Sequence, residues 1–307
     1  GDSAFEACEN IKKIVLRNGI LTIGTRAFYG CKALESITIP ESVTSIGASA
    51  FYNCFGLQSL VIPSSITSIG ESAFYSCKAL ESVSIPGSVT IIEESAFAEC
   101  ENIVDVVIEN GVTSIGANAF YNCKALDNVT IPESVTNIGN DAFKTGAYIL
   151  AVYITDIASW CNITFGNLEA NPRASHNKTA FVINGEAVVN ELIIPNDVTK
   201  INDYALAREG GGIIESIVLP ETLTTIGNYA FSCCAKLDDR WLNDWNESHI
   251  GISRNHDSAE VLGLKSLSNN DGCRTVSRTD DCYGSSLGKL EEQGRQRQGH
   301  KDTKLCR

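Results

Sequence analysis

The amino-acid sequence predicts an α/β repeat solenoid, a stack of similar units in which a strand, a turn and a short helix recur. The first observation is a period of 23 residues in the dipeptide Ala-Phe. The alanines of its copies are Ala4, Ala27, Ala50, Ala73, Ala96, Ala119 and Ala142. The second is the dipeptide Ile-Pro, which starts at Ile39 and returns at Ile62 and Ile85. A fixed period of this length is typical of stacked repeats that share one continuous core.

The strand of each unit is predicted just before the Ile-Pro dipeptide. In one copy Ile37, Thr38 and Ile39 alternate between apolar and polar, which is the pattern of a half-buried strand. Pro40 follows, and because proline has no backbone N–H it marks the end of the strand. We expect the strands of successive units to pair in a parallel sheet, about 4.7–4.9 Å apart.

The return leg of the same unit carries a second set of apolar residues. Val43 and Ile46 begin this leg, and Gly47 allows a tight turn. Ala50 and Phe51 are then expected on a short helix or 3₁₀ turn. The small alanine allows close packing there, and the phenylalanine fills the core.

Cysteines recur with the same period, each three residues after a phenylalanine. The copies are Cys8, Cys31, Cys54, Cys77, Cys100 and Cys123, with Cys234 in the same place later in the chain. They could form disulfides between adjacent turns, or they could be a column of free, buried thiols that pack as small hydrophobic groups. We favour free thiols because all positions are equivalent and none has a designated partner. Zinc is not expected, since the repeats contain no Cys-x-x-Cys pair.

Units of the form Ile-Pro-x-Ser-Val-Thr-x-Ile-Gly-x-x-Ala-Phe-x-x-Cys-x-x-Leu resemble the BspA-like leucine-rich repeats, also called the Treponema pallidum type. The resemblance covers roughly residues 1–239. It implies a leucine-rich-repeat-like, right-handed stack with a parallel β-sheet on one face. It also implies a place on a bacterial or protozoan surface and adhesion to host proteins or other cells. The family brings no catalytic residues, so none are expected here.

Four segments are predicted along the chain. Residues 1–144 are the regular repeats, and residues 145–190 are an irregular insertion. The repeats resume over residues 191–239. Residues 240–307 have no period and few apolar residues, so this tail is expected to be poorly ordered; a polar cap on the solenoid is the alternative.

The insertion resembles a long variant unit of such repeat proteins, in which a short helix with a Trp-Cys pair precedes a hairpin. The pair here is Trp160 and Cys161. Asn184 and Gly185 stand between two apolar runs, which predicts the hairpin directly. We expect Trp160 to anchor the insertion in the core, and a reactive thiol at Cys161 is the alternative.

Charge and hydropathy narrow the range of partners. The 307 residues carry a formal net charge of −13, so nucleic acid is not an expected partner. The chain contains no run of 18 apolar residues, so no membrane insertion is expected in this piece. Because the chain opens on Gly1 in the middle of a repeat, we interpret it as a fragment in which signal and anchor sequences are not present.

No catalytic, cofactor-binding or metal-binding site is predicted. The four histidines lie outside the regular repeats, and they do not combine with cysteines at the spacing of zinc ligands. The chain has no GxSxG, HExxH, Walker or dinucleotide-binding motif. We therefore expect a protein that is not an enzyme and needs no cofactor.

Three surfaces are candidates for ligand contact. The first is a row of tyrosines on the return leg, interrupted by Ala98, which could grip a protein or sugar surface. Its members are Tyr29, Tyr52, Tyr75 and Tyr121. The second is the set of outward-facing strand positions, which are Ser36, Thr38, Ser59, Val61, Ser82, Ser84, Asp105, Val107, Asn128, Thr130, Ser216 and Val218. The third is the hairpin of the insertion.

The expected function is that of a non-catalytic binding module, extracellular or on a cell surface, that mediates adhesion. Its partners would be proteins or glycans on host or neighbouring cells. One alternative is a structural spacer that presents a missing domain. Another is the accessory region of an enzyme whose catalytic domain lies outside this fragment.

Overall fold

The structure, a computed structural model, describes residues 1–146, 148–175, 179–207 and 214–232. The chain divides into two units, and all described residues lie in the first, Gly1–Asn270. The predictions for the tail, for Cys234 and for the four histidines lie outside the described residues. The boundaries of the four predicted segments remain predictions.

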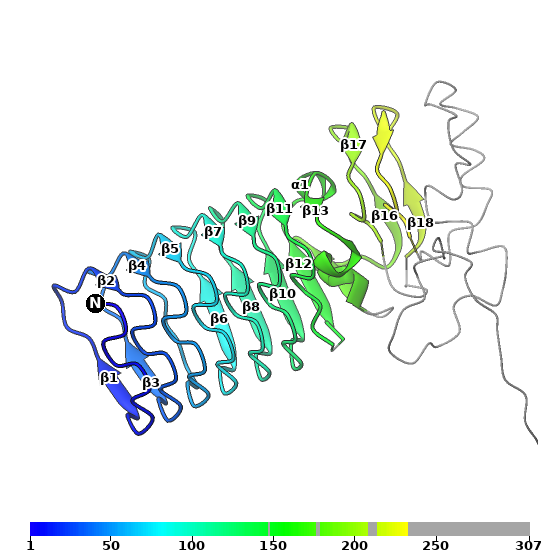
Figure 1. The fold of residues 1–307 in the computed structure, drawn as a ribbon. Helices are drawn as coiled ribbons and strands as arrows, with labels where there is room; N and C mark the ends of the chain where they lie inside the picture. Colours follow the sequence, from blue (N-terminus) through cyan, green and yellow to red (C-terminus); the bar gives the residue numbers. More distant parts are fainter. Residues whose placement is uncertain (147, 176–178, 208–213, 233–307) are drawn as a thin grey trace, which may run out of the picture. The chain divides into compact units, whose positions relative to one another are not determined.

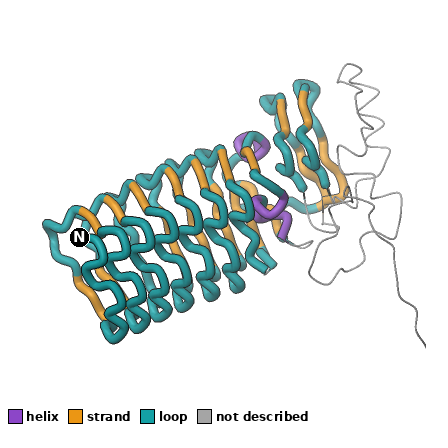
Figure 2. Tube along the Cα trace, in the orientation of Figure 1, coloured by secondary structure: helices purple, strands orange, loops and turns teal. Residues whose placement is uncertain are grey.

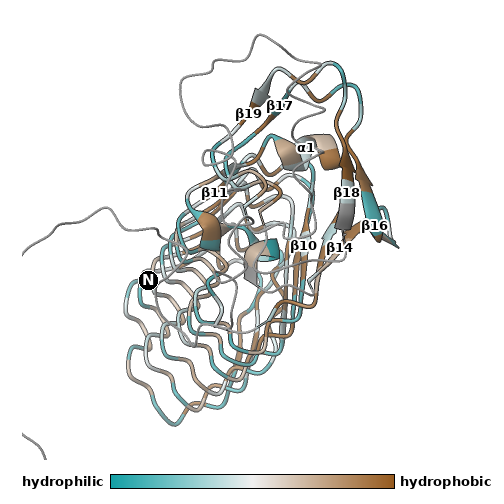
Figure 3. Ribbon diagram, turned by 90° about the vertical axis from the view of Figure 1, so that its right-hand side faces the viewer, coloured by the Kyte–Doolittle hydropathy of each residue, from teal (hydrophilic) through white to brown (hydrophobic). Residues whose placement is uncertain are grey.

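The repeats form a parallel-strand β-solenoid of about 9 turns, which confirms the predicted fold class (Figure 1). Most regular turns have a strand on one side and a shorter strand on the return leg, joined by loops (Figure 2). The turn that contains Ser59 has only an isolated bridge, to Ser36, on the first side. Helices are few and short, so the expected α/β character is present only in part. Figure 3 shows apolar and polar stretches recurring from turn to turn along the stack.

The longer strands form a six-stranded sheet with the order β15-β14-β12-β10-β8-β6. Its strands are β6 (Ser82–Ile85), β8 (Asp105–Ile108), β10 (Asn128–Ile131), β12 (Ala151–Ile154), β14 (Ala180–Ile183) and β15 (Glu186–Ala187). In the first turns β1 (Lys13–Val15) pairs with β3 (Ser36–Thr38) in the same parallel way. Residues 23 apart lie side by side, because each turn repeats the register of the one before.

A second parallel sheet, which the sequence analysis did not expect, runs along the return leg with the order β13-β11-β9-β7-β5-β4-β2. Its two-residue strands are β2 (Thr22–Ile23), β4 (Ser45–Ile46), β5 (Ser68–Ile69), β7 (Ile91–Ile92), β9 (Ser114–Ile115), β11 (Asn137–Ile138) and β13 (Thr164–Phe165). In β4, Ser45 faces outward while Ile46 is buried. The single sheet of the sequence analysis is therefore accompanied by a short one that closes the other side of the core.

The helix expected at Ala50 and Phe51 is instead a pair of consecutive turns. Alternate backbone N–H groups of this segment form hydrogen bonds to the next unit. Ser49 N–H donates to the carbonyl of Glu71, and Phe51 N–H donates to the carbonyl of Ala73. Because these N–H groups are used between units, they cannot form the internal ladder of a helix. Ser49 also has a φ of 54°, a left-handed conformation that ends helical geometry.

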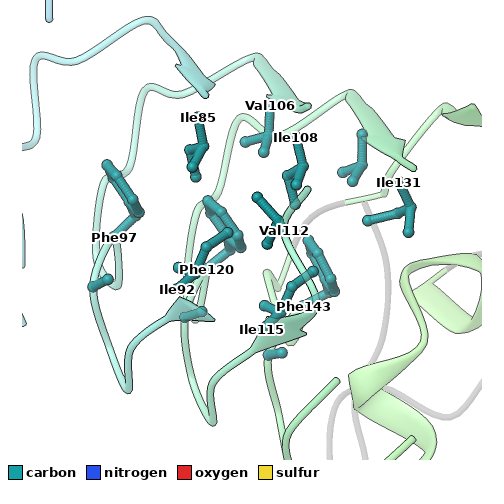
Figure 4. Close-up of a cluster of buried hydrophobic side chains, with 14 of the residues drawn as sticks. Ile85, Ile92, Phe97, Val106, Ile108, Val112, Ile115, Phe120, Ile131 and Phe143 are labelled. Atoms are coloured by element: carbon teal, nitrogen blue, oxygen red, sulfur yellow. The ribbon is translucent and has the colours of Figure 1, made fainter. Parts of the chain in front are cut away.

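The core is one continuous column in which each apolar side chain packs on its own copy in the neighbouring turn. The phenylalanine rings stack nearly parallel, with centroids 5.0 Å apart for Phe51 and Phe74 and 5.1 Å for Phe74 and Phe97. Figure 4 shows how Phe97, Phe120 and Phe143 follow one another between the two layers of strands. This stacking confirms the shared core that the period predicted.

The six periodic cysteines from Cys8 to Cys123 are free thiols, as predicted. From Cys31 to Cys123 each thiol is buried and donates to the carbonyl oxygen of the phenylalanine 26 residues earlier, in the preceding turn. The Sγ–O distance is 3.2 Å between Cys54 and Phe28. The cysteine column thus adds weak side-chain hydrogen bonds to the backbone bonds between turns.

The insertion contains the predicted short helix, α1 (Ile157–Cys161), and two 3₁₀ helices, η1 (Leu168–Ala170) and η2 (Pro172–Ser175). The Asp156 carboxylate caps α1 by accepting from the N–H groups of Ala158 and Ser159. The predicted hairpin is also present: β14 and β15 pair antiparallel, and both Asn184 and Gly185 have positive φ.

The resumed repeats pair with each other and not with the earlier sheets. They comprise β16 (Asn190–Ile193), β17 (Lys200–Ile201), β18 (Ile214–Val218) and β19 (Thr225–Ile226), paired β16 with β18 and β17 with β19. Side chains bridge the break in the strand ladders. Trp160 Nε1 donates to the carbonyl of Ala205 at 2.7 Å, and Asn202 Nδ2 donates to the carbonyl of Asn162 at 2.7 Å. The insertion therefore joins two runs of repeats.

Candidate functional site

The predicted tyrosine row forms a ladder on the return leg. The rings of Tyr29 and Tyr52 stack with centroids 4.9 Å apart, and those of Tyr52 and Tyr75 with centroids 4.6 Å apart. All of these rings are half-buried. The guanidinium of Arg26 lies 4.3 Å from the centre of the Tyr29 ring. Much of the surface of each stacked ring is therefore covered by its neighbours, as for the phenylalanines in the core.

Ala98 occupies the place of the ring between Tyr75 and Tyr121, so the ladder is interrupted there. Burial raises the pKa of Tyr75, and the nearby carboxylate of Glu99 adds to the shift. The phenol is therefore neutral at physiological pH and can donate one hydrogen bond. The structure brings three of the four predicted tyrosines into one stack and leaves the fourth apart.

The outward-facing strand positions form two straight rows across the six-stranded sheet. One row contains Ser82, Asp105 and Asn128, and the other contains Val107 and Thr130, each beside its neighbour in the next strand. The members are mostly small, so most of this face offers few large side chains. Large exposed apolar side chains are the exception, such as Val61 in the same outward position of an earlier turn.

The sheet face is hollowed where β8, β10 and β12 meet. The hollow has a volume of ≈220 Å³. Its lining residues are Asp105, Val106, Val107, Asn128, Thr130 and Tyr153. Tyr153 is 38% exposed and lies directly beside Thr130 in the sheet. The hollow thus combines an aromatic side chain with hydroxyl, amide and carboxylate groups.

The polar groups of the hollow are held in place by one short hydrogen bond. Asn128 Nδ2 donates to Asp105 Oδ1 at 2.7 Å, across neighbouring strands. Among the described residues, the second carboxylate oxygen of Asp105 and the amide oxygen of Asn128 have no protein partner. A positioned carboxylate and amide, open to solvent, can accept and donate hydrogen bonds to a ligand.

Tyr153 is the member of the hollow that sequence reasoning missed. Tyr153 lies within the predicted irregular insertion, residues 145–190, although it follows Thr130 by one full period of 23 residues. The strand register continues through β12, where Val152 pairs with Val129 and Ile154 with Ile131. Extending the period past residue 144 is the signal that would have found it.

The third candidate surface, the hairpin, offers little to a ligand. Both residues of β15 are exposed, and a side chain added at Gly185 would meet nothing within 4 Å. The hairpin instead supplies the antiparallel edge of the six-stranded sheet.

The environments of two buried thiols, Cys54 and Cys161, favour packing over reactivity. Burial raises the pKa of Cys54 to about 12 and that of Cys161 to about 12, so both are protonated at physiological pH. Trp160 is 1% exposed and donates its indole N–H across the break in the repeats, which confirms its anchoring role. The reactive-thiol alternative at Cys161 has no support from this environment.

Within the part of the chain that the structure describes, no three His, Cys, Asp or Glu side chains gather as a metal site. Over the same residues, no helix is both long enough and apolar enough to cross a membrane.

The model of the BspA type leucine rich repeat region matches this chain in 6 copies, over residues 1–108, 91–170 and 177–253. The chain belongs to this family. The match runs through the insertion and into the resumed repeats, and it agrees with the ladders of strands, phenylalanines and cysteines. Leucine-rich repeats of this kind typically mediate protein interactions, and the family is generally non-catalytic. Curated protein sequences include no relative that matches this chain.

Several solved structures are similar to the BspA-type chain. A leucine-rich repeat protein from Bacteroides ovatus shares 21% identity, with 83% of this chain and 79% of that chain covered and a TM-score of 0.43. One from Eubacterium ventriosum shares 21%, with 77% and 80% covered and a TM-score of 0.39. A leucine rich cell surface protein from Faecalibacterium prausnitzii shares 23%, with 78% and 64% covered and a TM-score of 0.36. Similarity at this level carries no argument about function.

Proposed function

We propose that the chain is a non-catalytic binding module, secreted or exposed on a cell surface, that attaches to proteins or glycans of host or neighbouring cells. Its family membership carries the proposal, because leucine-rich repeats typically mediate interactions. The surface location and the adhesive role follow from the resemblance of its repeats and are part of the proposal.

The arrangement of the turns supports a binding role. Backbone hydrogen bonds join neighbouring turns on both legs, so the outward side chains stand on a pre-organised frame. A pre-organised surface loses little conformational entropy when a ligand binds. Two surfaces on this frame are the candidate contacts: the tyrosine row and the outward face of the six-stranded sheet.

Binding to arrays of extracellular-matrix proteins and glycans tests the proposal. The full chain is compared with a variant in which Tyr29, Tyr52, Tyr75 and Tyr121 are replaced by alanine, which removes the rings and their hydroxyl groups. Loss of binding in the folded variant supports the tyrosine row, and unchanged binding supports the sheet face. A folded chain that binds nothing on either array contradicts the proposal.

A further inference from the structure

We propose that the hollow between β8, β10 and β12 is a sugar-binding site that takes a neutral hexose ring of a glycan. The inference rests on the proposed binding function and names the ligand class of one of its two surfaces. The hollow supplies the two kinds of contact that a sugar ring needs: an apolar surface for its C–H face and polar groups for its hydroxyls.

The apolar contact comes from Tyr153. Tyr153 lines the hollow and is 38% exposed, and Val107, two strands away on the other side of Thr130, is 41% exposed. An aromatic ring attracts the weakly positive C–H groups of a sugar because the face of its π-system is negative. Unlike the stacked tyrosines of the return leg, Tyr153 has no aromatic neighbour among the described residues. Its ring surface is therefore open to a ligand.

The polar contacts come from Asp105 and Asn128. The bond between them fixes both groups, and it leaves a carboxylate oxygen, an amide oxygen and one amide N–H free to reach hydroxyls. Adjacent hydroxyls of a sugar can donate to the carboxylate and accept from the amide at the same time. Hydrogen bonds to a charged acceptor are stronger than neutral ones, which favours a hydroxyl-rich ligand.

The size of the hollow fits one ring. It spans three strands, or about 9–10 Å across the sheet, and two outward positions, or about 7 Å, along a strand. A longer glycan would extend along the rows of small residues on either side. The repeat geometry therefore gives one site for a sugar ring, flanked by rows of small side chains.

The charge around the hollow favours a neutral sugar over an acidic one. Asp105 lies inside it, and Glu109 directly follows β8, where it accepts from Ser84 Oγ at 3.2 Å. No Lys or Arg lines the hollow. Together with a formal net charge of −13, this repels sulfate and carboxylate groups on a ligand.

The test is binding of the full chain to immobilised neutral oligosaccharides that end in mannose, galactose or glucose, with heparin as the anionic probe. We expect binding to at least one neutral series and none to heparin. Tyr153→Ala should weaken that binding about tenfold, equivalent to about 1.4 kcal/mol, because it removes the aromatic contact. Asp105→Asn should weaken it by about tenfold or more. Tyr153→Phe, which keeps the ring, should stay within about threefold of the original affinity.

Val15→Ala is the matched control, because Val15 stands 61% exposed in β1, four turns before β8, and its replacement should leave affinity unchanged. Equal binding by the original chain, Tyr153→Ala and Asp105→Asn overturns the inference, as does preference for heparin. Extracellular-matrix proteins form a separate arm. If the chain binds a protein there but no neutral sugar, the sugar site is wrong and the binding module stands. If it binds neither, both proposals fail.

Discussion

At the residue scale, the phenylalanine stack concentrates much of the core packing in one side chain per turn. Phe74 is fully buried between the rings of Phe51 and Phe97. Replacing it with alanine removes contacts on both sides and leaves a cavity that the two neighbouring turns cannot close. We expect Phe74→Ala to lower the free energy of unfolding by about 3–5 kcal/mol, measured by urea denaturation.

Phe5 provides the matched control for this prediction. It occupies the same place in its unit, but it stacks on Phe28 alone and is 43% exposed. Phe5→Ala should therefore cost clearly less than Phe74→Ala. Equal costs for the two variants would show that stacking between turns is not the source of the stability.

The cysteine column makes a second residue-scale prediction, on pH. Burial raises the pKa of Cys54 to about 12, above the ordinary value of 9.0, so the folded protein disfavours the thiolate. A raised pKa means that this stabilising contribution is complete below about pH 9 and is lost as the pH rises toward about 12. We expect a fall in Tm above about pH 9, and a shallower fall in Cys54→Ala.

Thiol labelling checks the same point independently. At pH 8 the thiol of Cys54 should react far more slowly with a disulfide reagent in the native chain than in the urea-unfolded chain, because it is buried and protonated. Half-buried Cys8 serves as the internal comparison. Equal rates for Cys8 and Cys54 in the native chain would contradict the buried column.

Single residues also show where sequence reasoning succeeds and where it stops. The core places of Phe51 and Cys54 could be predicted because apolar residues that recur in register must share an environment. The hollow could not be predicted in this way. It depends on Tyr153, which departs from the small residues of its row, and a departure from a pattern gives no signal about its neighbours.

At the element scale, the expected short helix became two turns for a reason that one unit alone cannot reveal. The Ala-Phe segment has residues that a helix accepts, and its period alone does not distinguish a helix from turns. The neighbouring unit favours the turns over the helix, because Phe51 N–H donates to the carbonyl of Ala73 and this hydrogen bond exists only in the stack. The second short sheet has the same origin, since two-residue strands are stable only as part of a ladder.

The insertion gives an element-scale prediction about the joint between the two runs of repeats. Trp160 Nε1 donates to Ala205, whose carbonyl also accepts from Asn171 Nδ2 at 3.2 Å. Trp160→Phe keeps an aromatic ring and removes the stronger of these bonds, at a cost of about 1–3 kcal/mol. Amide hydrogen exchange should become faster in β17 and in residues 202–206.

The early turns act as the control in the same experiment. Exchange in β4 and β5 should be unchanged, because in a repeat protein each unit depends mainly on its neighbours. Faster exchange throughout the chain would mean that the repeats unfold as a single cooperative body and that Trp160 is not a local joint.

At the scale of the whole molecule, a 23-residue period determines the fold of the regular repeats, because their strand and ring ladders follow from it. Strand register, core stacking and the cysteine column could all be predicted from spacing. The outward strand positions could be predicted from spacing too, but not the hollow among them, since these positions are under no packing constraint. The proposed sugar site accordingly lies where a large side chain, Tyr153, interrupts a row of smaller ones.

The claim that the repeats present a local binding surface is tested most directly by removing two internal turns. Excision of residues 40–85 joins Ile39 to Pro86 in register and removes Tyr52 and Tyr75, and it leaves the hollow intact. We predict that this variant folds and binds neutral oligosaccharides with the affinity of the full chain. Loss of binding only in the variant would assign the contacts to the removed turns. Absence of oligosaccharide binding in both folded proteins would contradict the sugar site, and absence of protein binding as well would leave the repeats as a spacer.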